Sequence, residues 1–321
     1  AKRVRDRDLE GLDLSCVRVA GCGAEPIQAD TLRAFADRFG RLGFREAAFV
    51  PSYGMAENTL AIAFATGVPT DRVLQEKLWG EGVAEPAPQD SDPADVVEIV
   101  HCGRSFPEHG IRIVDVETRA VLPERKVGEI EVSGPSVMQG YYEMPEATRE
   151  TIDEDGWMHT GDLGYLADGN IFICGRAKDV IIVNGKNYYP QDLEWAGSEV
   201  PGVRAGNVVA FPSYREGLGR EAVVVVAETK EPEGREQLAR EVQSAIAKVT
   251  GLTVDEVVMA DAGTIPKTSS GKLQRRKARQ LFEQDALSKR EDEGRLKLAG
   301  RVVESQLAHL KLSIFGKNER K

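Results

Sequence analysis

The sequence predicts a mixed α/β and α+β protein with two domains and a helical tail. Three observations lead to this fold class. Strands alternate with amphipathic helices over residues 1–95, short strands separated by turns fill 96–176, and a compact mixture of strands and helices follows over 177–285. A chain of 321 residues is long enough for about two domains, each with its own core.

The first region, residues 1–95, is typical of an α/β layer. Residues 14–27 (LSCVRVAGCGAEPI) predict a strand that runs into a glycine-rich turn. The helix expected next carries its apolar side chains on one face, namely Leu32, Phe35, Phe39 and Leu42. A strand, a loop and a further helix or strand are expected over 45–67. Residues 80–95 are rich in Pro, Gly and acidic residues, which predicts an exposed loop.

The second region, 96–176, is expected to form an antiparallel sheet or small barrel from the segments VVEIVHCGRSF, GIRIVD, VGEIEVSG and NIFICGR. The third region begins near Lys178 with DVIIVNG, whose Asn-Gly pair is a strong hairpin signal. Strands NVVAFPS and EAVVVVAET, a helix over 234–249 and the loop TIPKTSSGK follow. The tail, 286–321, is expected to be helical, with Leu296, Val303, Leu307 and Leu310 on one stripe.

Composition limits the classes of function. The net charge of −10 repels a phosphate backbone and argues against nucleic-acid binding. No apolar run approaches the roughly 20 residues of a membrane-spanning helix, and the first residues lack the pattern of a secretory signal, so we expect a cytoplasmic protein. The four cysteines and four histidines are dispersed, which predicts free thiols and no metal cage built by the protein alone.

Two segments carry residue types suited to a nucleotide. In YGMAENT (53–59), an aromatic ring, a glycine and a carboxylate share a loop that could stack a base and hold a metal ion. In WMHTGDLGYL (157–166), Asp162 follows a Thr-Gly turn, and the two oxygens of one carboxylate match the vicinal hydroxyls of a ribose. Taken singly, the first segment means little, because Tyr-Gly turns are common, and the preferred reading of the second is an aspartate that caps a turn.

Two more segments carry basic residues. In CGRAKDVIIVNGKNYYP (174–190), Arg176 stands at the end of a strand, where its guanidinium would suit ribose or phosphate oxygens; a solvated surface arginine is the alternative. In TIPKTSSGKLQRR (264–276), Lys272 sits in a mobile Ser/Thr/Gly-rich loop that could bring its charge to a transition state. It is not a Walker loop, because seven residues separate Gly263 from Gly271 and no Ser or Thr follows Lys272.

In this order and at these separations, the four segments resemble the adenylate-forming superfamily of acyl-CoA synthetases, adenylation domains and luciferases, over residues 15–283. The resemblance implies ATP and Mg²⁺ as cofactors. It also implies that 1–176 belong to a large AMP-binding domain, with an α/β layer and a small β-barrel, and that 177–285 form a mobile lid domain. It assigns Lys272 as the catalytic lysine, Glu57 to Mg²⁺ and Lys178 to the hinge. It assigns the nucleotide to Gly23, Ala24, Glu25, Pro26, Tyr53, Gly54, Met55, Ala56, Asp162, Arg176 and Lys272.

Within the superfamily, the chain is most similar to fatty acyl-AMP ligases. This likeness rests on Ala56 in YGMAEN, on the segment GAEP and on the long stretch 64–100. The implied reaction activates a fatty acid with ATP to acyl-AMP and pyrophosphate. The acyl group then passes to the phosphopantetheine thiol of an acyl carrier protein or carrier domain, as in lipid or polyketide biosynthesis. CoA is the less favoured acceptor.

Three alternatives stay open: an acyl-CoA ligase, an adenylation domain of a peptide synthetase, and a non-catalytic domain that binds nucleotide or a carrier protein. Superfamily members carry a Ser/Thr/Gly-rich phosphate loop upstream of GAEP, and this sequence has no such segment. We therefore expect the chain to lack the N-terminal half of an adenylating enzyme, which builds most of the acyl pocket. By itself it should show little catalysis and leave a strand edge unpaired.

Overall fold

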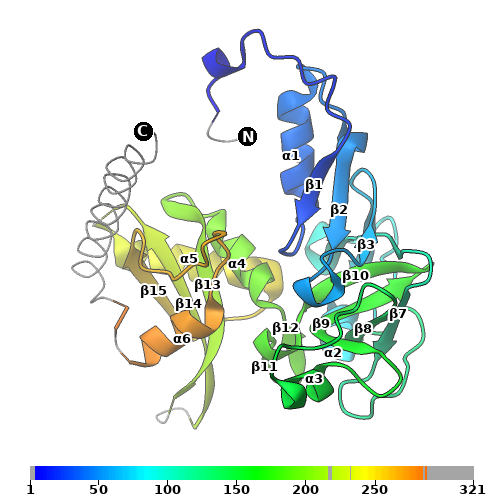
Figure 1. Cartoon of the computed structure of the whole chain (residues 1–321). Helices are drawn as coiled ribbons and strands as arrows, with labels where there is room; N and C mark the ends of the chain where they lie inside the picture. The colour runs from blue at the N-terminus through cyan, green and yellow to red at the C-terminus, as the bar shows by residue number, and fades with distance from the viewer. Residues whose placement is uncertain (1–3, 216–218, 232, 285, 288–321) are drawn as a thin grey trace, which may run out of the picture. The chain divides into compact units, whose positions relative to one another are not determined.

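The computed structural model describes residues 4–215, 219–231, 233–284 and 286–287 of the chain (Figure 1). The chain divides into two compact units, residues 1–191 and 192–321. The helical tail expected over 286–321, with its leucine stripe, lies outside the described residues except for residues 286 and 287.

The first unit begins with a small α/β sheet, as the sequence predicts. Its strands, in spatial order, are β1 (Ala20–Gly23), β2 (Phe49–Tyr53), β3 (Ala63–Phe64) and β6 (Arg104–Ser105). β1 and β2 are parallel, and the other pairs are antiparallel. Helix α1 (Ala29–Gly40) connects the parallel pair and buries Leu32 and Phe39 against Phe44 and Phe49, so its predicted apolar face is confirmed. Single-turn 3₁₀ helices flank these strands: η1 (Asp6–Leu9), η2 (Glu46–Ala48) and η3 (Ala56–Asn58).

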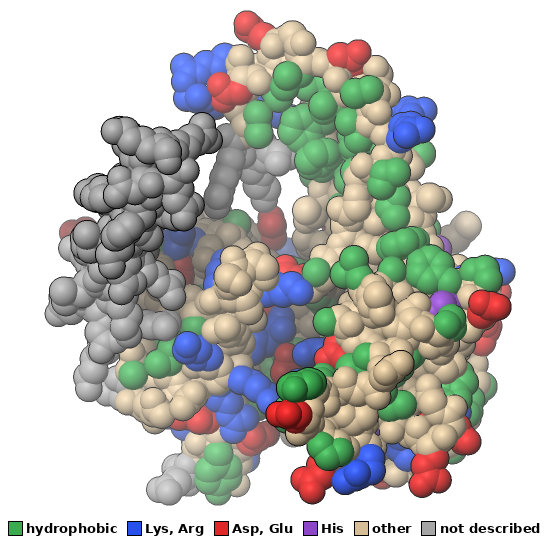
Figure 2. All heavy atoms as spheres, viewed as in Figure 1, with side chains coloured by type: hydrophobic (Ala, Val, Ile, Leu, Met, Phe, Trp, Pro, Cys, Tyr) green, Lys and Arg blue, Asp and Glu red, His purple; other side chains and the backbone are tan. Residues whose placement is uncertain are grey.

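β1 forms one edge of this sheet within the described part of the chain. Figure 2 shows hydrophobic side chains at the surface over the segment that carries α1. Among the nearby residues, Val19 is 70% exposed, directly before β1. A strand edge of this kind presents backbone groups and apolar side chains that can pair with a further strand.

A two-stranded ribbon of β4 (Thr70–Leu74) and β5 (Val96–Val100) follows. Helix α2 (Gln75–Glu81) and the single turn η4 (Pro93–Asp95) lie between its strands. The sequence predicts an exposed loop over 80–95, and most of its residues are indeed exposed. Ala84 is nevertheless fully buried, and its backbone N–H donates to the Arg125 carbonyl at 2.8 Å. This loop is therefore fastened to the rest of the unit at its middle.

The second sheet of the first unit is an antiparallel meander. Its strands are β7 (Gly110–Val114), β8 (Gly128–Ser133), β9 (Met158–Ala167) and β10 (Asn170–Arg176), in the spatial order β10-β9-β8-β7. Helix α3 (Pro145–Thr151) precedes β9. Ile113, Ile130, Met158 and Ile171 are almost completely buried and form the core under this sheet. The predicted strands GIRIVD, VGEIEVSG and NIFICGR are confirmed in this sheet. The segment VVEIVHCGRSF instead forms β5 and β6, which pair with β4 and β3.

The hairpin predicted after Lys178 is confirmed. β11 (Ile181–Val183) pairs with β12 (Lys186–Tyr188), after the single turn η5 (Ala177–Asp179). Asn184 and Gly185 between the strands have φ values of 51° and 77°, as a two-residue hairpin turn with two left-handed residues requires. The ring of Tyr188 lies 5.5 Å from that of Trp79 in α2. The hairpin belongs to the first unit, whereas the sequence predicts a domain boundary after residue 176.

The second unit is a compact α+β domain, as predicted. Its elements are α4 (Pro190–Ser198), β13 (Val203–Arg215), β14 (Arg220–Thr229), α5 (Arg235–Thr250), β15 (Glu256–Asp261) and α6 (Arg275–Glu283). β14 is the central strand, antiparallel to β13 and parallel to β15, and α5 makes the crossover between the parallel strands. Residues 222–229 of β14 are all buried, which makes this strand the centre of the unit's core.

Candidate nucleotide-binding site

The segment 23–26 begins at Gly23, the last residue of β1, beside the end of its parallel neighbour β2. Gly23 is opposite Ser52, and a Cβ atom on Gly23 would lie 2.4 Å from the Ser52 carbonyl oxygen, so only glycine fits. Ala24 has a φ of 70°, and the chain turns away at that point. Ligands of open α/β sheets bind beyond the C-terminal ends of parallel strands. The four residues of GAEP are therefore where a nucleotide site is expected.

The loop after β2 folds back on itself tightly. A Cβ atom on Gly54 would lie 1.7 Å from the Leu60 carbonyl oxygen, and the Ile62 N–H donates to the Tyr53 carbonyl at 2.9 Å. This close approach holds Met55, Ala56 and Glu57 in a compact turn beyond the strand end. Both predicted segments, GAEP and YGMA, are thus placed at the same edge of one parallel strand pair.

Three of the predicted residues are in direct contact. The Tyr53 hydroxyl donates to Asp162 Oδ2 at 2.9 Å, and Arg176 Nε donates to Asp162 Oδ1 at 2.8 Å. The Asp162 side chain is 14% exposed. Burial, with the Asp162 charge in addition, raises the pKa of Tyr53 well above its ordinary value, so the phenol stays protonated as a donor. Tyr53 itself is 8% exposed. Most of the ring is thus covered by the protein, and the hydroxyl is bonded to Asp162.

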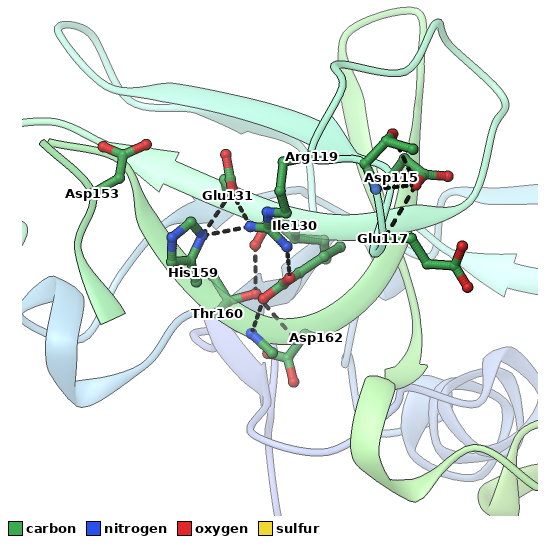
Figure 3. Close-up of polar contacts among 12 residues, drawn as sticks. Asp115, Glu117, Arg119, Ile130, Glu131, Asp153, His159, Thr160 and Asp162 are labelled. Carbon is green, nitrogen blue, oxygen red and sulfur yellow. Dashed lines mark hydrogen bonds and ion pairs between the residues drawn. The ribbon is translucent and has the colours of Figure 1, made fainter. Parts of the chain in front are cut away.

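A bulge in β9 places Asp162. The pairing of β8 with β9 shifts register beside Glu129, and Gly161 has a φ of 69°. The Gly161 N–H donates to Glu129 Oε1 at 3.1 Å, and the Asp162 N–H donates to Thr160 Oγ1 at 3.1 Å. Thr160 Oγ1 in turn donates to the Ile130 carbonyl at 2.7 Å (Figure 3). The Thr-Gly pair read from the sequence as a turn is therefore a bulge inside a ten-residue strand.

Behind the bulge lies a buried cluster of charges around Glu131, which is 1% exposed (Figure 3). Glu131 accepts hydrogen bonds from Arg112 Nε at 2.6 Å and from Arg119, and it contacts His159 Nδ1 at 2.6 Å. The Arg112 guanidinium also lies 4.1 Å above the ring of Trp157. Because each of these charges has a partner, the cluster braces β8 and β9 and supports the strand that carries Asp162.

Glu57, the predicted Mg²⁺ ligand, has a neighbour that sequence reasoning missed. The Tyr141 hydroxyl donates to Glu57 Oε1 at 2.8 Å, and this bond is the largest cause of a raised pKa for Tyr141. No group of three or more His, Cys, Asp or Glu side chains suited to a metal ion is found in the part of the chain that the structure describes. Mg²⁺ is commonly held by one or two carboxylates together with substrate phosphates. A single carboxylate at Glu57 fits that mode of binding.

Lys272 is an exposed residue of the second unit, in a closed turn between β15 and α6. The Lys272 N–H donates to Thr268 Oγ1 at 3.0 Å, and the Thr268 N–H donates to the Lys272 carbonyl at 2.9 Å. Lys178 lies in η5, two residues after Arg176, and is also exposed. Tyr53, Asp162 and Arg176 are therefore brought together by the fold of the first unit, while Lys272 belongs to the other unit.

Two family models match the chain. Residues 2–142 match the AMP-binding enzyme family, and residues 178–292 match the AMP domain of Disco-interacting protein 2-like proteins. The chain belongs to the adenylate-forming, AMP-binding superfamily. Sequence relatives from this superfamily include a putative acyl-CoA synthetase of Caulobacter vibrioides, 40% identical over 88% of this chain and 49% of the relative. Another is the long-chain-fatty-acid–AMP ligase FadD26 of Mycobacterium tuberculosis, 35% identical over 90% of this chain and 52% of the relative.

Solved structures of adenylate-forming enzymes share the fold. One, from a study of fatty acyl-adenylate ligases of E. coli and L. pneumophila, has a TM-score of 0.80 at 37% identity and covers 88% of this chain and 51% of that chain. McyG A-PCP complexed with phenylalanyl-adenylate has a TM-score of 0.71 at 30% identity, with coverage of 90% and 48%. The chain spans about half the length of the curated relatives it matches. None of the helices in the described ranges is long and apolar enough to cross a lipid bilayer.

Proposed function

We propose that this chain contributes the nucleotide-binding and lysine-bearing portion of an enzyme that activates a fatty acid with ATP. The observation that carries the proposal is the contact of Asp162 with both Tyr53 and Arg176 beside the ends of β1 and β2. Relatives named as long-chain-fatty-acid–AMP ligase and fatty-acid–CoA ligase support the substrate class. An acyl-CoA ligase is the second candidate, because both kinds of ligase are found among the relatives.

In this proposal Asp162 binds the two ribose hydroxyls of ATP. Each carboxylate oxygen offers about two acceptor positions, so the hydrogen bonds from Tyr53 and Arg176 leave room for a vicinal diol. Those two bonds fix the orientation of the carboxylate before the nucleotide arrives, which reduces the cost of ordering it on binding. The segments 23–26 and 53–56 flank the base from the ends of their strands.

The reaction joins an oxygen of the fatty acid carboxylate to the α-phosphorus of ATP and breaks the bond from that phosphorus to pyrophosphate. Glu57 would hold Mg²⁺, which supplies positive charge to the phosphate oxygens. Lys272 would place its ammonium against the negative charge that develops at the reacting phosphorus. Its exposure leaves this ammonium available, since no side-chain partner of Lys272 is found within the described residues.

The acyl acceptor in this proposal is the phosphopantetheine thiol of a carrier protein or carrier domain. The likeness to McyG A-PCP supports this choice over CoA. Lys178 is proposed as the pivot that separates the two half-reactions, because it lies two residues after Arg176 in an exposed single turn. A cytoplasmic location fits the need for ATP and carrier protein.

The proposal is tested by ATP–pyrophosphate exchange with a panel of fatty acids. The chain would be assayed alone and fused to the N-terminal half of the Caulobacter vibrioides relative, followed by transfer to CoA or to a phosphopantetheinylated carrier protein. Exchange by the fusion with transfer to the carrier protein is the expected result. Efficient acyl-CoA formation would favour the second candidate, and a fusion that folds but does not exchange would refute adenylation.

A further inference from the structure

The two ends of the Lys272 loop, residues 264–274, are held in place, although its tip is exposed. Thr264, Ile265 and Pro266 are buried where the loop leaves β15, while Ser269, Ser270 and Lys272 at the tip are exposed. A loop with this distribution is constrained at its base, so the position of its tip depends on what holds the base in place.

A buried carboxylate holds the first end. Glu228 of β14 is 1% exposed, and its Oε1 accepts the Ile265 N–H at 2.8 Å. Its other oxygen pairs with Arg204. Nearby, the Lys267 ammonium donates to the Gly206 carbonyl at 2.8 Å. Arg204 and Gly206 belong to the same irregular stretch of β13, where the pairing with β14 shifts register. The start of the loop is thus fastened to the central strand and to its neighbour.

A second buried carboxylate holds the other end. Glu194 of α4 has a side chain 6% exposed and pairs with the Arg275 guanidinium fork through two hydrogen bonds, at 2.7 Å from Nε to Oε1 and 2.6 Å from Nη2 to Oε2. Glu194 Oε1 also accepts the Ala210 N–H at 3.1 Å. Arg275 is the first residue of α6 and follows Lys272 by three positions. A bidentate pair of this kind restricts both distance and orientation.

Backbone contacts connect the two ends. The Gln274 N–H donates to the Pro266 carbonyl at 3.0 Å, and Lys267 forms a bridge with Leu273. Residues 268–272 then close the tip through the hydrogen bonds between Thr268 and Lys272. Moving the base would leave a buried carboxylate without its donor, which is strongly unfavourable. The loop is therefore closed by backbone contacts at its base and held at both ends by buried carboxylates, although its glycine and serine content predicts a mobile segment.

We propose that Glu194 and Glu228 are positioning residues that set where Lys272 presents its ammonium. This inference rests on the proposed function, because it assigns a role toward the adenylation lysine. Both glutamates are buried, and their observed bonds are to groups of their own unit. Each holds one end of the loop, and together they determine the direction of the turn at 268–272. A displacement of about 1 Å in a preorganised group costs on the order of 100-fold in rate.

The test compares Glu194→Gln and Glu228→Gln with a matched control, Asp255→Asn. Asp255 pairs with Arg220 at 2.7 Å and accepts the Val223 N–H at 2.8 Å in the same unit, away from the loop. Limited trypsin digestion of this chain, read by mass spectrometry, follows cleavage after Lys267 and Lys272. We expect both glutamine variants to be cut there about tenfold faster than wild type, and Asp255→Asn to be cut at the wild-type rate.

The second readout is pyrophosphate exchange in the fusion protein described above. We expect kcat to fall by roughly tenfold or more in the glutamine variants, with the KM for ATP within about twofold of wild type, because ground-state binding is left intact. Arg275→Lys keeps the charge but loses the guanidinium fork, so its kcat should lie between those of wild type and Glu194→Gln. If a glutamine variant fails to fold, Arg275→Lys is measured in its place.

The outcomes separate the two proposals. Wild-type cleavage of the loop in both glutamine variants would overturn the anchoring role, whatever the activity. Faster cleavage with unchanged kcat would show that the anchors do not position Lys272, and that also overturns the inference. A wild-type fusion that folds without exchanging refutes the proposed function instead, and the digestion result on the chain alone still reports on the anchors.

Discussion

Arg176 and Asp162 are register partners on the antiparallel strands β10 and β9, with Arg176 Nε 2.8 Å from Asp162 Oδ1. Partners directly opposite each other project from the same face of a sheet. Tyr53 approaches the same carboxylate from β2 of the other sheet in this unit. The Asp162 carboxylate thus links the two sheets, because its Oδ1 contacts Arg176 of one sheet and its Oδ2 contacts Tyr53 of the other. All three side chains come from strands, which hold them more firmly than loops would.

Replacing the central carboxylate should weaken nucleotide binding. We expect Asp162→Asn to lower the affinity for AMP or a stable acyl-adenylate analogue by about tenfold or more, since hydrogen bonds to a charged acceptor contribute roughly 1.5–3 kcal/mol. Titration calorimetry on the chain measures this. Asp168→Asn, in the turn between the same two strands, is the control and should bind normally. Equal affinity of Asp162→Asn and wild type would remove Asp162 from the site.

Gly54 should not tolerate a methyl group. An added Cβ would lie 1.7 Å from the Leu60 carbonyl oxygen, which is backbone and cannot move aside, so Gly54→Ala should destabilise the first unit by about 1–3 kcal/mol. A Cβ added to Gly21 would meet no atom within 4 Å, so Gly21→Ala is the matched comparison in the neighbouring strand. Urea denaturation followed by tryptophan fluorescence compares the two. Similar midpoints would contradict the tight turn.

The link between α1 and β5 should depend on pH. Arg33 forms two hydrogen bonds with Glu98, at 2.6 and 2.7 Å, and they lower the pKa of Glu98 below its usual value of 4.5. A lowered folded-state pKa stabilises the protein above the unfolded value, and the effect disappears as the pH falls through the folded value. Amide exchange in α1 should therefore be faster in Glu98→Gln than in wild type near about pH 6, with the difference shrinking as the pH falls toward about 3.

If the difference in α1 amide exchange between Glu98→Gln and wild type stayed constant from about pH 6 to about pH 3, the Arg33–Glu98 pair would not be its source. Arg5 and Asp8, an exposed pair whose partners are three residues apart, provide the comparison. Asp8→Asn should leave amide exchange in α1 unchanged at both pH values, because exposed ion pairs contribute little.

Lys272→Ala should abolish most adenylation and leave the fold intact. Removing one preorganised positive group typically costs on the order of 2.7–4 kcal/mol of barrier, or a hundredfold or more in rate. Lys272 is exposed, so the melting temperature should stay at the wild-type value. Pyrophosphate exchange in the fusion protein is the assay, and Lys277→Ala on the exposed side of α6 is the control. Exchange at the wild-type rate would exclude the role proposed for Lys272.

Local patterns predicted much of the fold. The apolar spacing of 29–40 predicted α1, and the Asn184-Gly185 pair predicted the hairpin, because both depend on neighbours in sequence. Strand β9 was missed as a strand because it contains Gly161 and Gly164, which usually indicate turns. Gly161 is needed for the bulge, and a Cβ on Gly164 would lie 2.2 Å from the Phe172 carbonyl oxygen. Both requirements come from the neighbouring strands and cannot be read locally.

The candidate site was predicted in part for the same reason. Asp162, Arg176 and Tyr53 stood out as motif residues, and the structure brings them together. Tyr141 and Glu129 did not stand out in the sequence, because each meets its partner only after folding. Tyr141 lies 84 residues from Glu57, and Glu129 lies 32 residues from Gly161. The alternating glutamates of GEIEV were the one available signal, since acidic side chains in a buried strand require partners.

The cluster around Glu131 limits how this sheet can change in evolution. Arg112, Arg119 and His159 share one buried carboxylate, so replacing any one of them changes the contacts of the others, and replacing Glu131 removes the acceptor that all three share. Substitutions at these four positions should therefore be strongly epistatic, each harmful alone and tolerated when the others change with it. Homologues are expected to keep the charged set whole or to exchange it together for apolar residues, with few intermediates between the two.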